Sequence, residues 1–175
     1  MTDPLTSAQR HRCMACIHST GTKPERIVRR FLFACGLRFR LHVKYLPGSP
    51  DIVLPKYHTV IFVNGCFWHG HENCRHFRLP QTHTDFWQRK IARNRERDHQ
   101  ASAALTAAGW HVVTLWECEL KPAVREQTLL RLYVALNHHY IELYALPGKR
   151  PATPRTDDDM PMAAEPDTPY GPPSR

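Results

Sequence analysis

The sequence contains no apolar run close to the roughly 18 residues that mark a membrane-spanning helix, and no basic segment followed by an apolar one at its start. Neither membrane insertion nor secretion is therefore supported, and we expect a cytoplasmic protein with no membrane partner. Internal repeats are also absent. With 175 residues, 42% of them hydrophobic, the chain can bury one sizeable core, so a single folded domain is expected.

Positive charge is unevenly distributed along the chain. The formal net charge is +8, but residues 147–175 carry five acidic against four basic side chains, so residues 1–146 have a net charge of about +9. A basic surface of this kind favours a polyanion such as nucleic acid, because neutralised phosphates release their counterions, although solubility alone explains some such excesses. Eight of the fifteen prolines lie in residues 147–175, where apolar residues are scarce, and we expect a disordered tail there.

Six cysteines are interleaved with histidines, which in a reducing compartment favours metal binding over disulfides. Cys13 and Cys16 form a close Cys-x-x-Cys pair, but the chain has no second one. We interpret residues 1–20 as a basic arm with a short helix, in which these cysteines share an apolar stripe with Met14 and Ile17. Half of a zinc site is the alternative.

Hydrophobic periodicity and capping residues predict an α/β domain over residues 21–146. A helix is expected between an N-cap at Thr22 and Gly36, and a second one, capped by Thr84, over 85–108. Apolar runs predict strands over 37–43, 51–54, 59–63 and 110–116, the last one buried, followed by a helix over 123–138. The strands 51–54 and 59–63 are expected to form a hairpin in the middle of a sheet.

Three potential metal ligands, Cys66, His71 and Cys74, fall within nine residues. Cys118, after the predicted strand 110–116, could complete a set of three thiolates and one imidazole, which are ligands that structural zinc prefers. The alternative is a group of buried thiols with surface histidines. His69 alternates with His71 and would point away from such a zinc knuckle, which leaves it available for acid–base or phosphate chemistry.

Two acidic residues are candidates for a second metal site. Asp51 opens the strand 51–54 in a basic, histidine-rich neighbourhood, so it is either a turn residue or a ligand for a divalent ion. Glu25 lies in the first turn of a predicted helix, where a carboxylate suits the helix dipole. Only a partner acid across a cleft would make Glu25 a metal-site group.

Large aromatic residues flank the predicted cationic surface. Phe67 and Trp68 lie inside the predicted zinc loop, and Trp87 lies in the first turn of the basic helix. Rings in small zinc loops usually belong to the core, whereas rings on a basic face can stack on bases or insert between them. Both interpretations stay open at this point.

Several segments, in order and spacing, resemble the very-short-patch repair (Vsr) mismatch endonucleases from about residue 8 to residue 121. They are LPGxPD at 46–51, FVxGCFWHxH at 62–71, TxFW at 84–87, KIxxNxxRD at 90–98, GW at 109–110 and WEC at 116–118. The resemblance implies a restriction-endonuclease-like α/β core, with a central mixed sheet flanked by helices. It also implies a monomeric enzyme, functionally linked to a DNA cytosine methyltransferase, that nicks double-stranded DNA 5′ to the thymine of a T:G mismatch left by deamination of 5-methylcytosine.

The resemblance also implies roles for single residues. Asp51 matches the family's magnesium ligand, beside the carbonyl group of Val63, and Glu25 matches an acid that acts through water. His69 matches the catalytic histidine. A structural zinc is implied at Cys66, His71, Cys74 and Cys118. Relative to the family, this sequence has one extra residue between His71 and Cys74.

DNA contacts are implied by the same resemblance at three kinds of position. The aromatic wedge that opens the duplex matches Phe67, Trp68 and Trp87. The arm that enters from the opposite groove matches Met14 and Ile17, and the two base-contacting groups match Lys90 and Asn94.

Asn64 departs from the family, which often has a second active-site histidine at this position. Asparagine cannot shuttle a proton, although it can hydrogen-bond to a phosphate or a water. We expect a magnesium-dependent nicking enzyme. The first alternative is a zinc-stabilised module that binds mismatched or distorted DNA without cutting it, against which Asp51 argues because an acid among phosphates costs affinity. The second is a restriction-type endonuclease that cuts intact DNA, against which the wedge argues.

Overall fold

The computed structural model describes residues 20–145 together with Thr6, Gln9 and Arg12. The predicted arm contacts of Met14 and Ile17, and the predicted tail, lie outside these residues. The helices are α2 (Lys23–Ala34), α3 (Thr84–Ala107) and α4 (Arg125–Ala145), with two short 3₁₀ helices: η1 (Pro55–Tyr57) and η2 (Glu117–Leu120). No helix among the described residues is both long and apolar enough to cross a membrane.

The sheet has four strands in the order β1-β2-β3-β4. β1 (Arg40–Leu41) pairs antiparallel with β2 (Ile52–Leu54), which pairs antiparallel with β3 (Thr59–Asn64). β3 pairs in parallel with β4 (His111–Trp116). The predicted mixed sheet, with the β2–β3 hairpin at its centre, is therefore confirmed.

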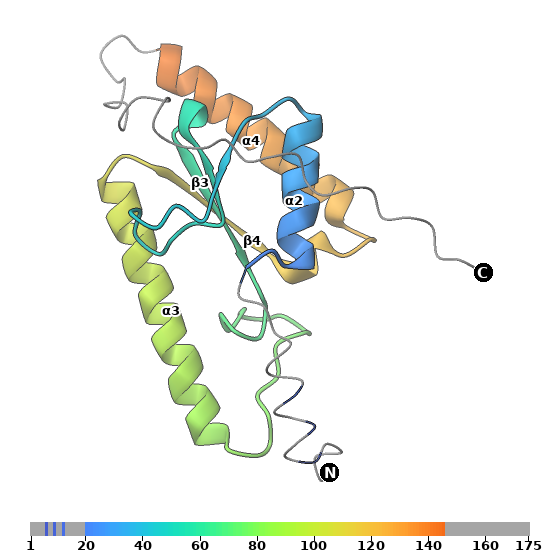
Figure 1. The fold of residues 1–175 in the computed structure, drawn as a ribbon. Coiled ribbons are helices and arrows are strands. Elements are labelled where there is room, and N and C mark those ends of the chain that lie inside the picture. Colours follow the sequence, from blue (N-terminus) through green and yellow to red (C-terminus); the bar gives the residue numbers. More distant parts are fainter. Residues whose placement is uncertain (1–5, 7–8, 10–11, 13–19, 146–175) are drawn as a thin grey trace, which may run out of the picture.

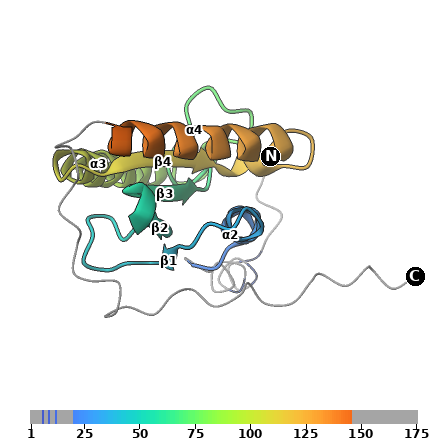
Figure 2. The ribbon, with the colours of Figure 1, turned by 90° about the horizontal axis from the view of Figure 1, so that it is seen from above.

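Alternating side chains of the central hairpin divide the interior into two cores. In the first core, Ile52, Leu54 and Ile61 pack against Leu32 of α2 and Leu132 of α4. The opposite face packs with Leu105 of α3: Val43, Val53, Val60 and Trp110. In Figure 1, α3 accordingly lies on one side of the strands and α2 and α4 on the other, and Figure 2 shows α3 and α2 on opposite sides of the strands.

The ends of α2 agree with the sequence, whereas the start of α3 does not. Thr22 caps α2 in a capping box with Glu25, and Pro24 lies in the first turn. The N-cap of α3 is His83, not Thr84, whose hydroxyl instead donates to the carbonyl oxygen of Pro80 at 3.0 Å. The predicted cap at Thr84 is wrong by one residue because that side chain binds the preceding loop rather than the helix.

Two other predicted boundaries and the predicted burial of one strand also change. β1 is much shorter than the predicted strand 37–43, since His42 has φ 47° and leaves the extended conformation. β4 is an edge strand and is only partly buried, so the prediction of a buried strand there is wrong. α4 continues past His138 to Ala145, because Tyr140 packs on Tyr57 of η1 with ring centroids 5.1 Å apart.

Candidate active site and metal centre

Asp51 lies where the central hairpin meets the short strand β1. The antiparallel register places it beside the end of β3, and the N–H of Val63 donates to Oδ2 of Asp51 at 2.7 Å. The backbone N–H of His42 donates to the Asp51 carbonyl oxygen at 3.4 Å. The structure therefore brings Asp51 and Val63 together through the Val63 N–H, which holds one carboxylate oxygen, and the implied role of the Val63 carbonyl group stays a prediction.

Glu25, His42 and Asp51 form a cluster whose potential ligand atoms all lie within 4.8 Å of one another. Burial raises the pKa of the Asp51 carboxyl, and the Glu25 carboxylate acts in the same direction. The Val63 N–H, His42 and Arg29 oppose that rise in pKa. A partly buried acid in this setting gains from a bound cation, which supplies a compensating charge.

Glu25 is already engaged by its own helix cap. The side chain is buried, and its oxygens accept from the Gly21 N–H at 2.9 Å, the Thr22 N–H at 3.1 Å, the Thr22 hydroxyl at 2.8 Å and Arg29 at 2.7 Å. The carboxylate thus lies in the first turn, as expected, and it takes part in a capping box with Thr22. Because four donors occupy the carboxylate, Glu25 can influence a metal at Asp51 only through its neighbours.

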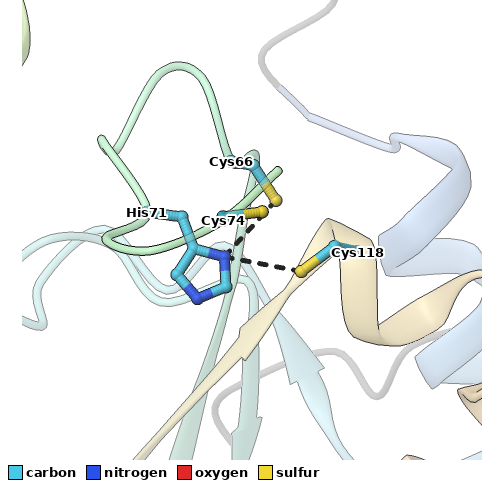
Figure 3. A group of neighbouring side chains, drawn as sticks. All are labelled: Cys66, His71, Cys74 and Cys118. Carbon is cyan, nitrogen blue, oxygen red and sulfur yellow. Dashed lines mark hydrogen bonds between the residues drawn. The ribbon is translucent and has the colours of Figure 1, made fainter. Parts of the chain in front are cut away.

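The four predicted zinc ligands come together at one end of the sheet. β3 and β4 are parallel and end in the paired residues Asn64 and Trp116, so Cys66 and Cys118 each lie two positions beyond the same edge. Figure 3 shows both thiols beside the imidazole of His71. Nδ1 of His71 is 3.6 Å from Sγ of Cys66 and 3.4 Å from Sγ of Cys118.

Cys74 completes this cluster, in which all four potential ligand atoms lie within 4.8 Å of one another. Burial raises the pKa of Cys118 to about 12, and the neighbouring thiols Cys66 and Cys74 act in the same direction. Three thiolates would repel one another here without a cation, whereas a metal ion stabilises them. Thiols and an imidazole at this spacing fit a tetrahedral ion. A Cys/His metal centre is therefore consistent with both the geometry and the charges.

His69 is not part of the Cys/His cluster. Its Nδ1 lies 2.5 Å from Oδ2 of Asp98, a residue of α3. The N–H of His69 donates to the Gly65 carbonyl oxygen at 3.2 Å, which folds the loop back toward the end of β3. Asn64, the last residue of that strand, is buried. His69 and Asp51 are thus attached to the same end of the hairpin, one by the loop and the other by the strand.

α3 holds the loop 65–71 in place through its polar face. Asn94 donates to the Trp68 carbonyl oxygen at 2.8 Å, and Arg95 donates to the Gly70 carbonyl oxygen at 3.1 Å. Gly70 has φ 60°, and a Cβ there would lie 2.6 Å from Ile91, so this position requires glycine. The structure therefore gives Asn94 a role in orienting the loop, and its implied base contact stays a prediction.

The aromatic residues form a surface cluster, which we call the aromatic patch: Phe67, Trp68, Phe86 and Trp87. The first two rings lie 5.2 Å apart, and each also meets Trp87 edge to face. Phe86 is 52% exposed, and none of the four rings belongs to either buried core. Nζ of Lys90 lies 5.5 Å from the centroid of Trp68, within cation–π range. The surface interpretation of these rings is therefore favoured over the core one.

Two partners in this region escaped the sequence-based identification of site residues. Asp98 lies on the same predicted face of α3 as Ile91 and Asn94, so an acid on that face was a usable signal for a partner of His69. Arg29 stands four residues after Glu25, the spacing of helical ion pairs, and it contacts both Glu25 and His42. The contact between Arg29 and His42 could not be found in the same way, because the two residues lie 13 positions apart in the chain.

Comparison with known proteins identifies the family. The family described as DNA mismatch endonuclease Vsr matches residues 2–76. A type II nicking enzyme, V.XorIIP of Xanthomonas oryzae pv. oryzae, is 51% identical over 120 residues, which cover 69% of this chain and 88% of that enzyme. The nicking enzyme V.NmeAIP of Neisseria meningitidis serogroup A is 48% identical over 133 residues, 75% and 94% of the two chains. The DNA mismatch endonuclease Vsr of Escherichia coli K12 is 41% identical over 121 residues, 69% and 77%. The chain therefore belongs to the Vsr family of DNA mismatch endonucleases.

Proposed function

We propose that this protein is a magnesium-dependent endonuclease that nicks duplex DNA 5′ to the thymine of a T:G mismatch, and so starts the repair of deaminated 5-methylcytosine. The observation that carries the proposal is Asp51, a partly buried carboxylate held by Val63 at the strand end from which the loop with His69 departs. The proposal includes a restriction-endonuclease-like fold, a monomeric state in the cytoplasm, and a functional link to the methyltransferase that produces 5-methylcytosine.

The residues around Asp51 fit a magnesium ion, which prefers oxygen ligands. Asp51 would hold it, together with the Val63 carbonyl group, and Glu25 would act indirectly. Bound Mg²⁺ would supply Lewis-acid activation of water and stabilise the charge on the leaving 3′ oxygen. A structural zinc at the four-residue Cys/His cluster would fix the loop that carries His69.

His69 and Asp98 are proposed to manage the proton. Asp98 accepts from Nδ1–H of His69 when the imidazole is neutral, so the proton stays on that nitrogen and Nε2 is free to accept one. This pairing also fixes the ring orientation. Asn64, at the strand end, cannot transfer a proton, so we assign it a hydrogen bond to the phosphate or to water.

His69→Ala is expected to lower the single-turnover nicking rate by roughly 10²–10⁴-fold, the usual contribution of a general acid or base. Asp98→Asn, which keeps the shape but disturbs the tautomer, should lower the rate in the same direction and by less. Binding of mismatched DNA should change little in either variant, and Asn64→His should be tolerated. An active His69→Ala enzyme would move the proton-transfer role to another residue.

The aromatic patch is proposed to insert into the base stack beside the mismatch. Unstacking costs a few kcal/mol, and least where pairing is already weak, so a wedge favours T:G over intact T:A duplex. Trp68→Ala should therefore reduce the ratio of T:G to T:A nicking rates by about tenfold, the equivalent of about 1.4 kcal/mol. Tyr45→Ala is a matched control, because Tyr45 is 58% exposed and lies outside the patch.

Total DNA affinity should depend on exposed cations of α3 rather than on Trp68. Replacing Arg89 and Arg93 with glutamine should weaken binding to every duplex and reduce its salt dependence, because fewer counterions are released. The measurement is a salt titration of binding beside the nicking rates. An unchanged T:G to T:A ratio in Trp68→Ala would show that the ring does not act as a wedge.

The proposed function is tested with end-labelled duplexes that differ at one position, T:G, T:A or C:G, with and without Mg²⁺. Nicking of T:G alone, and only with Mg²⁺, is the expected result. Selective binding of T:G without any cleavage would favour the DNA-binding module, which the asparagine at position 64 also permits. Equal cleavage of all three duplexes would favour a restriction-type enzyme.

A further inference from the structure

His42 lies in the Asp51 site although it comes from a turn after the short strand β1. Its φ of 47° is unusual for a residue other than glycine, and such strained residues gather at functional sites. The backbone hydrogen bond from His42 to Asp51 continues the β1–β2 register by one more residue. The turn therefore presents the imidazole to Asp51, the residue just before β2.

The tautomer of His42 follows from the partner of its Nε2. Nη2 of Arg29 lies 2.9 Å from that nitrogen, and a guanidinium group can only donate hydrogen bonds. Nε2 must therefore be the acceptor, and the ring proton must lie on Nδ1. Arg29 is itself held on Glu25, at 2.7 Å, inside the cap of α2.

The protonated Nδ1 faces the carboxylate oxygen of Asp51 that Val63 does not hold. Nδ1 of His42 lies 3.8 Å from Oδ1 of Asp51, whereas Val63 binds Oδ2. This distance exceeds that of a direct hydrogen bond. It is within reach of one bridging water, and such contacts at active sites tighten when substrate binds.

The same contacts argue against His42 as a metal ligand. A ligating imidazole offers a lone pair, but Nε2 uses its lone pair on Arg29 and Nδ1 carries a proton. The guanidinium charge of Arg29, 2.9 Å from the ring, would also repel a metal ion bound there. His42 is therefore better suited to act on a ligand than to be one.

We infer that His42 is a positioning residue for Asp51: Arg29 fixes its tautomer, and the resulting Nδ1–H orients the carboxylate that binds the catalytic cation. This inference rests on the proposed function of Asp51 as a metal ligand. The series Glu25, Arg29, His42 and Asp51 then links the cap of α2 to the metal site, which gives Glu25 an indirect role without a contact to the ion.

Two isosteric substitutions separate the two ring nitrogens. The amide nitrogen of asparagine can occupy the position of Nδ1, whereas the terminal atoms of glutamine reach the position of Nε2. His42→Asn therefore keeps a donor toward Asp51, His42→Gln keeps only a partner for Arg29, and His42→Ala keeps neither. A role limited to packing or to Arg29 would not favour asparagine over glutamine.

The experiment measures two values. The first is the Kd for Mn²⁺, determined by electron paramagnetic resonance on the zinc-loaded protein without DNA. The second is the Mg²⁺ concentration for half-maximal nicking of a T:G duplex. His42→Ala and His42→Gln should raise both values by about 10–100-fold, and His42→Asn by about threefold or less, the larger range being that of outer-shell partners of metal ligands. DNA affinity measured in Ca²⁺ should be unchanged, and Asp51→Asn should abolish Mn²⁺ binding.

Unchanged Mn²⁺ affinity in His42→Ala, or equal losses in the asparagine and glutamine variants, would overturn the inference. Reduced DNA affinity with normal Mn²⁺ binding would also overturn it and make His42 a DNA contact. Should the alanine variant fail to fold, the asparagine–glutamine comparison still decides. Suppose that the wild-type protein nicks no duplex while His42→Asn still binds Mn²⁺ more tightly than His42→Gln does. In that case the proposed function fails and the role of His42 stands.

Discussion

Replacing Asp51 with asparagine is expected to lower the single-turnover nicking rate by roughly 10³-fold or more. Asparagine keeps the shape of the side chain, and its carbonyl oxygen can still accept from the Val63 N–H. The charge that holds the cation is lost, however. Metal ions contribute several kcal/mol to transition-state stabilisation, and each 1.4 kcal/mol corresponds to about tenfold in rate.

The fold and the DNA affinity provide the controls for this variant. Burial raises the pKa of Asp51, so a neutral isostere should not lower the melting temperature measured without Mg²⁺. Affinity for a T:G duplex without Mg²⁺ should stay equal or increase, because one negative charge near the phosphates is removed. A fully active Asp51→Asn enzyme would contradict both the proposed metal site and the proposed mechanism.

The Cys/His cluster could be predicted from the sequence because its geometry depends on local rules. Cys66 and Cys118 each follow an apolar strand by two residues, and parallel neighbours end at the same edge of a sheet. His71 and Cys74 follow within one loop, so chain connectivity alone keeps them near. The start of helix α2 could be predicted equally well, because its capping box lies within four residues.

The partners of the candidate catalytic groups could not be predicted with the same ease. The contact between His69 and Asp98 joins residues 29 positions apart, and that between Arg29 and His42 joins residues 13 apart. Both depend on how α3 and α2 pack against the sheet, which periodicity does not specify. The turn at His42 is a further case, because a positive φ at a histidine has no sequence signal comparable to that of glycine.

Positions at the sheet edge show a related limit. The run from Trp110 to Trp116 is apolar enough for a central strand, yet β4 is an edge strand and Thr114 is exposed. An apolar composition shows that a strand can be buried on both faces. Whether it is buried depends on its position in the sheet. The exposed side of β4 is therefore a consequence of topology that composition did not indicate.

Removing one metal-ligating thiol is expected to have the largest effect on stability. Cys66→Ala or Cys118→Ala should abolish stoichiometric zinc binding and unfold at least the loop 65–74. Structural zinc supplies about 10–16 kcal/mol of apparent binding energy in zinc-finger peptides, as much as the total stability of a typical domain, about 5–15 kcal/mol. Circular dichroism and elemental analysis of the purified variants measure the two effects.

Cys35→Ala is the matched control for this experiment, because Cys35 is a partly buried free thiol at the end of α2, outside the metal cluster. It should lose only the energy of a small packed group and retain one zinc per chain. Chelation of the wild-type protein should reproduce the effect of the ligand variants, because the ligands then lose the ion that stabilises their charges. An intact fold without zinc in Cys66→Ala would mean that the two parallel strands hold the loop unaided. His69 would then be positioned by Asp98 and α3, and not by the metal centre.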